Sequence, residues 1–193
     1  ELALRSRRHG SPRLMVMLRP DSEDTLCSEH KLKSVTEAVR RWKNEGIDGF
    51  VIGFAEFSRQ TGNLEIAHEW LQSILKLAPQ KEWVFHRLMD RLPDPVQSLK
   101  VLETMGFRRV LSSGGAPSAF EGWENLMAWQ AVCPGLELLA GGGLRSGLVR
   151  DLMNRYPNRD RWPRAGLHSS CIPEGFDSAD EEELNRLLWV LKS

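Results

Sequence analysis

The sequence has few cysteines and no excess of charge of either sign. Its three cysteines in 193 residues are too few and odd in number for a disulfide framework, which favours a reducing compartment. Its 26 basic residues balance its 26 acidic residues, whereas a general nucleic-acid-binding protein usually carries a basic excess. These absences argue against a disulfide-stabilised secreted module and against nucleic acid as a partner.

Long apolar runs are also missing. No run approaches the roughly 18 apolar residues that a membrane helix needs, so we expect no membrane partner. The charged residues 1–8 lack the apolar stretch of a signal peptide. Hydrophobic residues nevertheless make up 41% of the chain, enough for one sizeable core. We therefore expect a cytoplasmic protein with a single domain over residues 1–193.

The sequence alternates short apolar runs with longer segments of helical spacing. Six runs are typical of buried strands: residues 14–18, 50–54, 83–86, 109–112, 136–140 and 165–169. The helical segments are 28–43, 64–77 with Asn63 as N-cap, 95–105 closed by Gly106, 120–131, 146–155 and 180–191. Apolar strands that are each followed by a helix indicate a parallel sheet covered on both faces. Six units fit an open doubly wound sheet, whereas a (β/α)8 barrel has eight strands.

Ligand sites in parallel α/β folds lie beyond the carboxyl ends of the strands. Two glycine clusters, Ser113-Gly114-Gly115 and Gly141-Gly142-Gly143, follow consecutive predicted strands and lead into helices. Glycine lets backbone N–H groups approach an anion closely, and the start of a helix adds a favourable dipole. The pattern predicts an anion site; the alternative is that these glycines only form tight turns.

His86 ends the third predicted strand, and an imidazole with a pKa near neutrality suits general acid–base catalysis. Asp90 is placed either to orient His86 or to pair with Arg87. The alternative is a hydrogen-bonded structural histidine. Arg19 ends the first predicted strand and suits either a substrate carboxylate or phosphate, or an ion pair with a neighbouring carboxylate.

Soft metal donors are present but scattered. Met15 and Met17 share one face of a predicted strand, and thioethers suit Cu(I), although core packing also explains them. Cys27 precedes the first predicted helix, a position that favours a thiolate, and His168 lies three residues before Cys171. No spacing is typical of a metal motif, so the sequence assigns no metal ligands.

Several segments, taken together, resemble the CutC family, proteins associated with copper homeostasis. They are residues 16–20, 48–53, 85–90, 109–115, 141–143 and 168–170, and their order and spacing agree over residues 12–176. The resemblance implies a TIM (β/α)8-type barrel whose strands three to eight are the six predicted here, without the first two βα units. It also implies a cytoplasmic, homo-oligomeric protein that binds Cu(I), with no established catalytic activity.

The resemblance also implies a site at the mouth of the barrel. The matching positions are Arg19, His86, Arg87, Asp90, Ser113, Gly114, Gly115, Gly142, Gly143 and His168. The cysteines that the family favours as copper ligands, near the ends of its first two strands, have no counterpart here. Residues 21–27 replace the family's glycine-rich acidic loop.

Three functional hypotheses follow. The first is a CutC-like, non-enzymatic role in copper homeostasis, with Cu(I) as the bound ion. The second is a TIM-barrel enzyme for a small phosphorylated or carboxylated metabolite, in which Arg19 and the glycine clusters hold the anion while His86 and Asp90 move a proton. The third is an inactive partial member of the family. We expect a homo-oligomer because a barrel without two strands has unpaired edges.

Overall fold

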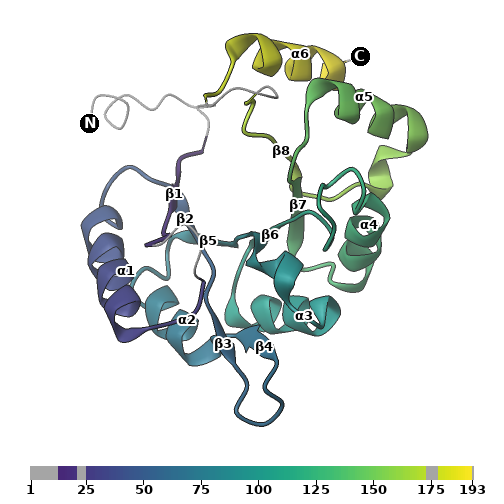
Figure 1. The fold of residues 1–193 in the computed structure, drawn as a ribbon. Helices are drawn as coiled ribbons and strands as arrows, with labels where there is room; N and C mark the ends of the chain where they lie inside the picture. Colours follow the sequence, from purple (N-terminus) through teal and green to yellow (C-terminus); the bar gives the residue numbers. More distant parts are fainter. Residues whose placement is uncertain (1–12, 21–24, 173–177, 193) are drawn as a thin grey trace. The chain divides into compact units, whose positions relative to one another are not determined.

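The computed structural model describes residues 13–20, 25–172 and 178–192. It divides the chain into two compact units, Glu1–Arg109 (unit 1) and Val110–Ser193 (unit 2). In both units, strands alternate with helices along the chain (Figure 1). The features predicted for residues 1–8 and 21–24 lie outside the described residues.

Unit 1 is built on three parallel strands in the order β1-β2-β5. Its strands and helices are β1 (Met15–Met17), α1 (Glu29–Trp42), β2 (Gly49–Ile52), α2 (His68–Leu75), β5 (Glu82–Phe85), the 3-10 helix η2 (Arg87–Arg91) and α3 (Pro95–Met105). The register places Phe50 beside both Val16 and Trp83. The rings of Phe50 and Trp83 stack with their centroids 4.9 Å apart, so one buried aromatic pair joins neighbouring strands.

Local signals account for the helix ends of unit 1. The hydroxyl of Ser28 accepts a hydrogen bond from the N–H of Lys31 at the start of α1. At the start of α3, Asp94 accepts the N–H of Gln97, and Pro95 takes the first helical position. Gly106 closes α3 with a φ of 91°, in the left-handed region that glycine adopts most easily. The predicted helix over 95–105 is therefore confirmed at both ends.

The predicted helix over 64–77 is wrong in its first part. Residues Ala55–Phe57 (β3) and Leu64–Ile66 (β4) pair instead as an antiparallel hairpin, and α2 begins only at His68. Asn63 is not an N-cap, because its carbonyl accepts the N–H of Ser58 across the hairpin. The alternation of residues 55–57 and 64–66 around Gly62, with a φ of 70°, is the hairpin signal that helical spacing concealed.

Unit 2 repeats the strand–helix alternation. Its elements are β6 (Arg109–Ser112), which starts at the last residue of unit 1, α4 (Trp123–Val132), β7 (Glu137–Gly141), α5 (Ser146–Arg155), the 3-10 helix η3 (Arg159–Arg161), β8 (Gly166–His168) and α6 (Glu181–Lys192). The strand order is β6-β7-β8, and β7 and β8 are parallel with Gly141 beside His168. Figure 1 shows α4 beside β7 and α6 beside α5.

All six predicted strands are present, shifted by at most a residue or two. Within each unit the strands follow one another in chain order, without the reversal that marks the switch point of a doubly wound sheet. Of the helices in the described ranges, none combines the length and the apolar character needed to cross a bilayer.

Candidate functional site

The predicted site residues fall into two groups, one in each unit. Arg19 follows β1 and His86 follows β5 in unit 1, and Arg87 and Asp90 belong to η2. Ser113, Gly114, Gly115, Gly142, Gly143 and His168 lie in unit 2. Within each unit these residues lie at or beyond the carboxyl ends of the strands, as predicted.

His86 is the most enclosed polar side chain of the first group, with 6% of its surface exposed. Its backbone N–H donates to the carbonyl of Ile52, and its Nδ1 accepts the N–H of Leu88 at 3.1 Å. A ring nitrogen that accepts a hydrogen bond carries no proton, so the proton of the neutral ring lies on Nε2. The imidazole thus serves as the cap of η2, and its Nε2 takes no part in this contact.

Gly53, at the end of β2, makes room for the imidazole. A Cβ at this position would lie 2.4 Å from Cε1 and 2.5 Å from Nδ1 of His86. Any side chain at residue 53 would thus require the ring to shift. The glycine is therefore required by close packing.

Burial lowers the pKa of His86 to about 4, and the positive charge of Arg19 acts in the same direction. The expectation of a pKa near neutrality was wrong, because the sequence does not reveal how deeply the ring is buried. His86 is neutral at physiological pH and suits donation of a hydrogen bond better than exchange of protons.

Asp90 pairs with Arg87, which was one of its two predicted roles. The Nε of Arg87 donates to Oδ2 of Asp90 at 2.9 Å; the carboxylate is buried and the guanidinium is partly exposed. The pair spans one turn of η2, which starts directly after His86. A second local contact thus stabilises the turn that His86 caps.

The first glycine cluster of unit 2 uses its polar groups internally. The buried hydroxyl of Ser112 accepts the N–H of Gly114 at 2.9 Å, and the amide of Asn125 donates to the Gly114 carbonyl at 2.9 Å. A Cβ on Gly114 would lie 2.2 Å from the carbonyl oxygen of Gly122, and φ at Gly114 is 75°. These contacts support the structural interpretation of Gly114, a tight turn.

The second glycine cluster meets the first. The carbonyl of Gly142 accepts the N–H of Ala119, from the loop between Gly115 and α4, at 2.9 Å. A Cβ on Gly141 would lie 3.0 Å from Cβ of the exposed His168. The structure thus brings the two clusters and the end of β8 together within unit 2, as the order of strands predicts.

Glu183 is a residue that sequence reasoning missed. Its buried carboxylate accepts the N–H of Ser146 at 2.6 Å and the Ser146 hydroxyl at 3.0 Å, at the start of α5. Burial raises the pKa of Glu183, but these bonds and Arg186 outweigh it, so the pKa lies below its ordinary value. The helix start predicted to attract an anion thus already holds a carboxylate of the chain itself.

A sequence signal for Glu183 exists. Asp180 accepts the N–H groups of Glu182 and Glu183, so Asp180-x-x-Glu183 has the spacing of a capping box. The spacing identifies the start of α6, whereas the contact with Ser146 depends on the packing of α6 against α5.

Soft donors are scattered in the described parts of the chain, where no group of three or more His, Cys, Asp or Glu side chains is placed to hold a metal ion. Met17 is half-exposed and Cys27 is partly buried in unit 1. Burial, followed by the charge of Glu56, raises the pKa of the Cys27 thiol. The expectation that this position favours a thiolate was therefore wrong.

Comparison with known sequences identifies one family. The model of the CutC family matches residues 4–159. A CutC family protein of Treponema denticola is 33% identical over 68% of this chain and 52% of its own length. The human copper homeostasis protein cutC homolog is 32% identical over 68% of this chain and 46% of its own length. The chain thus spans about half the length of the curated relatives it matches.

Solved structures show the same fold at low sequence identity. A CutC structure from Streptococcus agalactiae matches with a TM-score of 0.62 and 21% identity, over 81% of this chain and 71% of the other. The aldolase QR15 matches with a TM-score of 0.56 and 18% identity, over 92% of this chain and 75% of the other. These likenesses support an α/β fold of the TIM-like kind.

Proposed function

Because the chain belongs to the CutC family, we propose that it takes part in copper homeostasis, the role for which its human relative is named, and that it binds Cu(I). The match of the family model over residues 4–159 carries this proposal. Copper is the cargo here, and the proposal includes no catalysis.

Met17 and Cys27 carry two of the sulfur donors of unit 1. Met17 exposes 51% of its surface, and its thioether is a soft ligand that needs no deprotonation. The thiol of Cys27 must lose a proton to bind the metal, and its raised pKa makes this loss harder. Any Cu(I) binding that involves Cys27 therefore weakens as the pH falls.

A competition titration tests the copper proposal. The reduced protein is titrated with Cu(I) against a chelator of known affinity. We expect uptake that weakens in Met17→Leu and Cys27→Ser, whereas Met153→Leu in unit 2 serves as the matched control. Uptake no tighter than about 1 μM, the affinity of a weak complex, would end the proposal for this chain.

The geometry around His86 favours a second candidate, an enzyme or binding protein for a small carboxylate or phosphate. The neutral imidazole keeps its Nε2 proton for donation, and the charge of Arg19 acts on the same ring. A hydrogen-bond donor beside a guanidinium is a pair that can hold an anion. In this arrangement His86 donates a hydrogen bond, and Arg87 and Asp90 fix the turn behind it.

Thermal unfolding with added anions tests this second candidate. Phosphate, sugar phosphates and small carboxylates are expected to raise the midpoint of the intact protein. The shift should disappear in His86→Gln and Arg19→Gln and persist in Arg40→Gln, a change at an exposed position of α1. If no anion moves the midpoint, or if all three variants respond alike, the candidate fails.

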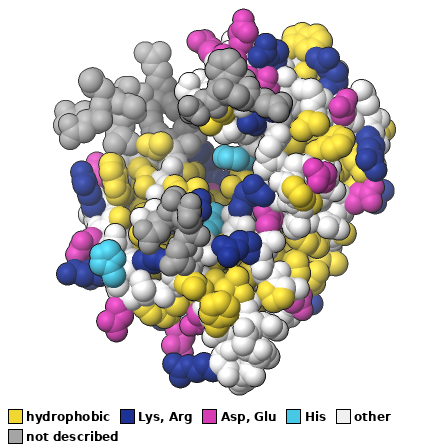
Figure 2. Space-filling model, in the orientation of Figure 1, with side chains coloured by type: hydrophobic (Ala, Val, Ile, Leu, Met, Phe, Trp, Pro, Cys, Tyr) yellow, Lys and Arg dark blue, Asp and Glu magenta, His cyan; other side chains and the backbone are white. Residues whose placement is uncertain are grey.

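The proposal also includes a cytoplasmic homo-oligomer. Leu184 and Leu188, one turn apart on α6, are each 45% exposed, and Trp189 is 64% exposed. Figure 2 shows hydrophobic side chains among charged ones over α5 and α6, at the upper right. Apolar side chains gathered on one surface helix favour a partner that covers them. Sedimentation velocity should show an oligomer that Leu188→Glu dissociates; a monomer at all concentrations would contradict it.

A further inference from the structure

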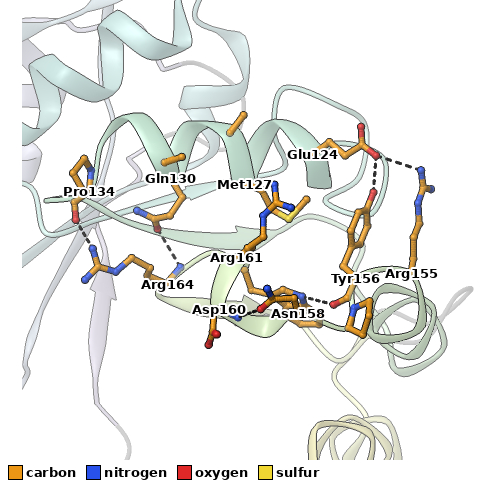
Figure 3. A pocket seen from close by; sticks show the side chains of 14 residues that line it. Glu124, Met127, Gln130, Pro134, Arg155, Tyr156, Asn158, Asp160, Arg161 and Arg164 are labelled. Carbon is orange, nitrogen blue, oxygen red and sulfur yellow. Dashed lines mark hydrogen bonds and ion pairs between the residues drawn. The ribbon is translucent and has the colours of Figure 1, made fainter.

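A groove in unit 2 lies between α4 and residues 155–164, the segment that leads from the end of α5 to β8 (Figure 3). Its volume is about 800 Å³, within the range of roughly 300–1,000 Å³ typical of small-molecule pockets. Pro134 and Arg164 line one part of it, just before β7 and β8 begin. The groove is thus separate from the carboxyl ends of the strands, where the residues predicted from sequence lie.

The segment that faces α4 is rich in arginine. Residues 155–164 contain four arginines and one aspartate, and Arg155, Arg161 and Arg164 line the groove. Arg155 lies 3.5 Å from Glu124, which also accepts the Tyr156 hydroxyl at 2.8 Å. Glu124 therefore offsets one of the three positive charges.

Arg161 supplies a charge that the groove does not neutralise. Among the described residues, its guanidinium has neither a hydrogen-bond nor an ion-pair partner. Figure 3 shows Arg161 directed toward α4, close to Met127, while the carboxylate of Asp160 points away from that helix. The groove thus presents an uncompensated cation above an apolar surface.

The apolar wall of the groove is held in place from behind. Trp162 packs edge-on against the fully buried Trp123, with the ring centroids 4.8 Å apart, and its Nε1 donates to the carbonyl of Tyr156 at 2.9 Å. The buried amide of Gln130 accepts the backbone N–H groups of Leu138 and Arg164. A preformed wall needs little ordering when a ligand binds, which favours affinity.

We propose that this groove binds a small organic anion, a carboxylate, phosphate or sulfonate with an apolar or aromatic body. Arg161 contacts the anionic group, and Met127, Ala128 and Trp162 contact the body. The charge of Arg161 favours an anionic ligand, whose charged group its guanidinium can pair with. The site is independent of copper binding and of His86.

Two fluorescent probes of matched shape test the proposal on the full chain: anionic anilinonaphthalene sulfonate and uncharged phenylnaphthylamine. The anionic probe should bind saturably. Arg161→Gln should weaken it about fivefold, the effect of losing one exposed ion pair, without changing the uncharged probe. Ala128→Glu, which adds a negative charge at an exposed position of the groove, should weaken it further. Unchanged thermal midpoints confirm that the variants are folded.

Arg150→Gln provides the matched control, because Arg150 lies over the ring of Trp189 beside the exposed apolar side chains of α6. This variant should bind both probes with the same affinity as the unsubstituted protein. The proposal is overturned if Arg150→Gln weakens the anionic probe and Arg161→Gln does not, because the probe then sits on α6. The absence of saturable binding, or equal losses for both probes in Arg161→Gln, overturns it too.

Discussion

The strand ends of the two units present their polar groups in different ways. In unit 1 the imidazole of His86 is buried, neutral and fixed through Nδ1. In unit 2 the glycine loops bond within the unit, and Glu183 binds the start of α5. Glycine clusters are the stronger sequence signal for an anion, yet in the structure their loops bond within unit 2, whereas His86 is a neutral, buried side chain at a strand end.

The largest expected effect on stability comes from a substitution that disrupts the backbone packing of unit 2. Gly114→Ala places a Cβ against the carbonyl oxygen of Gly122 at a positive φ. We expect the free energy of unfolding to fall by about 4 kcal/mol, the sum of a clash that cannot relax and a left-handed residue. Urea unfolding measures it. Gly115→Ala is the control: its φ is also positive, but its Cβ meets the Trp129 ring only at 3.6 Å, so we expect just the left-handed cost of about 1 kcal/mol.

The next largest effect is the pH dependence of stability that His86 in unit 1 produces. The pKa of His86 is lowered in the folded state, so the unfolded chain binds a proton at a higher pH than the folded protein. Stability should therefore be unaffected above pH ~6.5 and fall by about 3 kcal/mol as the pH drops from ~6.5 to ~4. Urea unfolding across this range checks the slope. His86→Gln should flatten it, and an unchanged slope would contradict the burial of the ring.

A smaller effect separates packing from charge at His86. Gly53→Ala should lower the free energy of unfolding by about 2 kcal/mol, because the new methyl group overpacks the buried ring. It should also shift the imidazole proton resonances in NMR spectra, since the ring must move from its position beside Leu88. Gly147→Ala is the matched control: nothing lies within 4 Å of its Cβ, and it lies in α5, so a slight stabilisation is expected.

The smallest expected effect on stability concerns Glu183, whose carboxylate binds the start of α5 in unit 2. Glu183→Gln should cost about 1 kcal/mol at neutral pH, because the amide keeps one acceptor but loses the charge. The folded pKa of Glu183 is lowered, so its contribution is present above the unfolded pKa near ~4.3 and is lost as the pH falls through the lower folded value. The acid unfolding curves of Glu183→Gln and of the unsubstituted protein should differ in this pH range. Glu181→Gln, at an exposed position of the same helix turn, should leave the curve unchanged.

The sequence predicted the elements whose signals are local. Gly106 was predicted to close the helix over 95–105 and does so, because a glycine cap acts on backbone groups of its own helix. The caps Ser28 and Asp94 also act within a few residues, although they were not named from the sequence. The hairpin of β3 and β4 was missed because residues 64–66 were assigned to the helix over 64–77 and residues 55–57 to no element, and only the pairing between them identifies both strands.

The positions of site residues at strand ends follow from topology, but their chemical state does not. The apolar runs and helical periods of the sequence determine a parallel α/β fold, because each acts over one strand or one turn. Tertiary structure alone decides the neutrality of His86, the need for glycine at residue 53, the occupation of the start of α5 by Glu183 and the groove beside Arg161. Each depends on burial and on partners brought from other elements, and no local pattern encodes either.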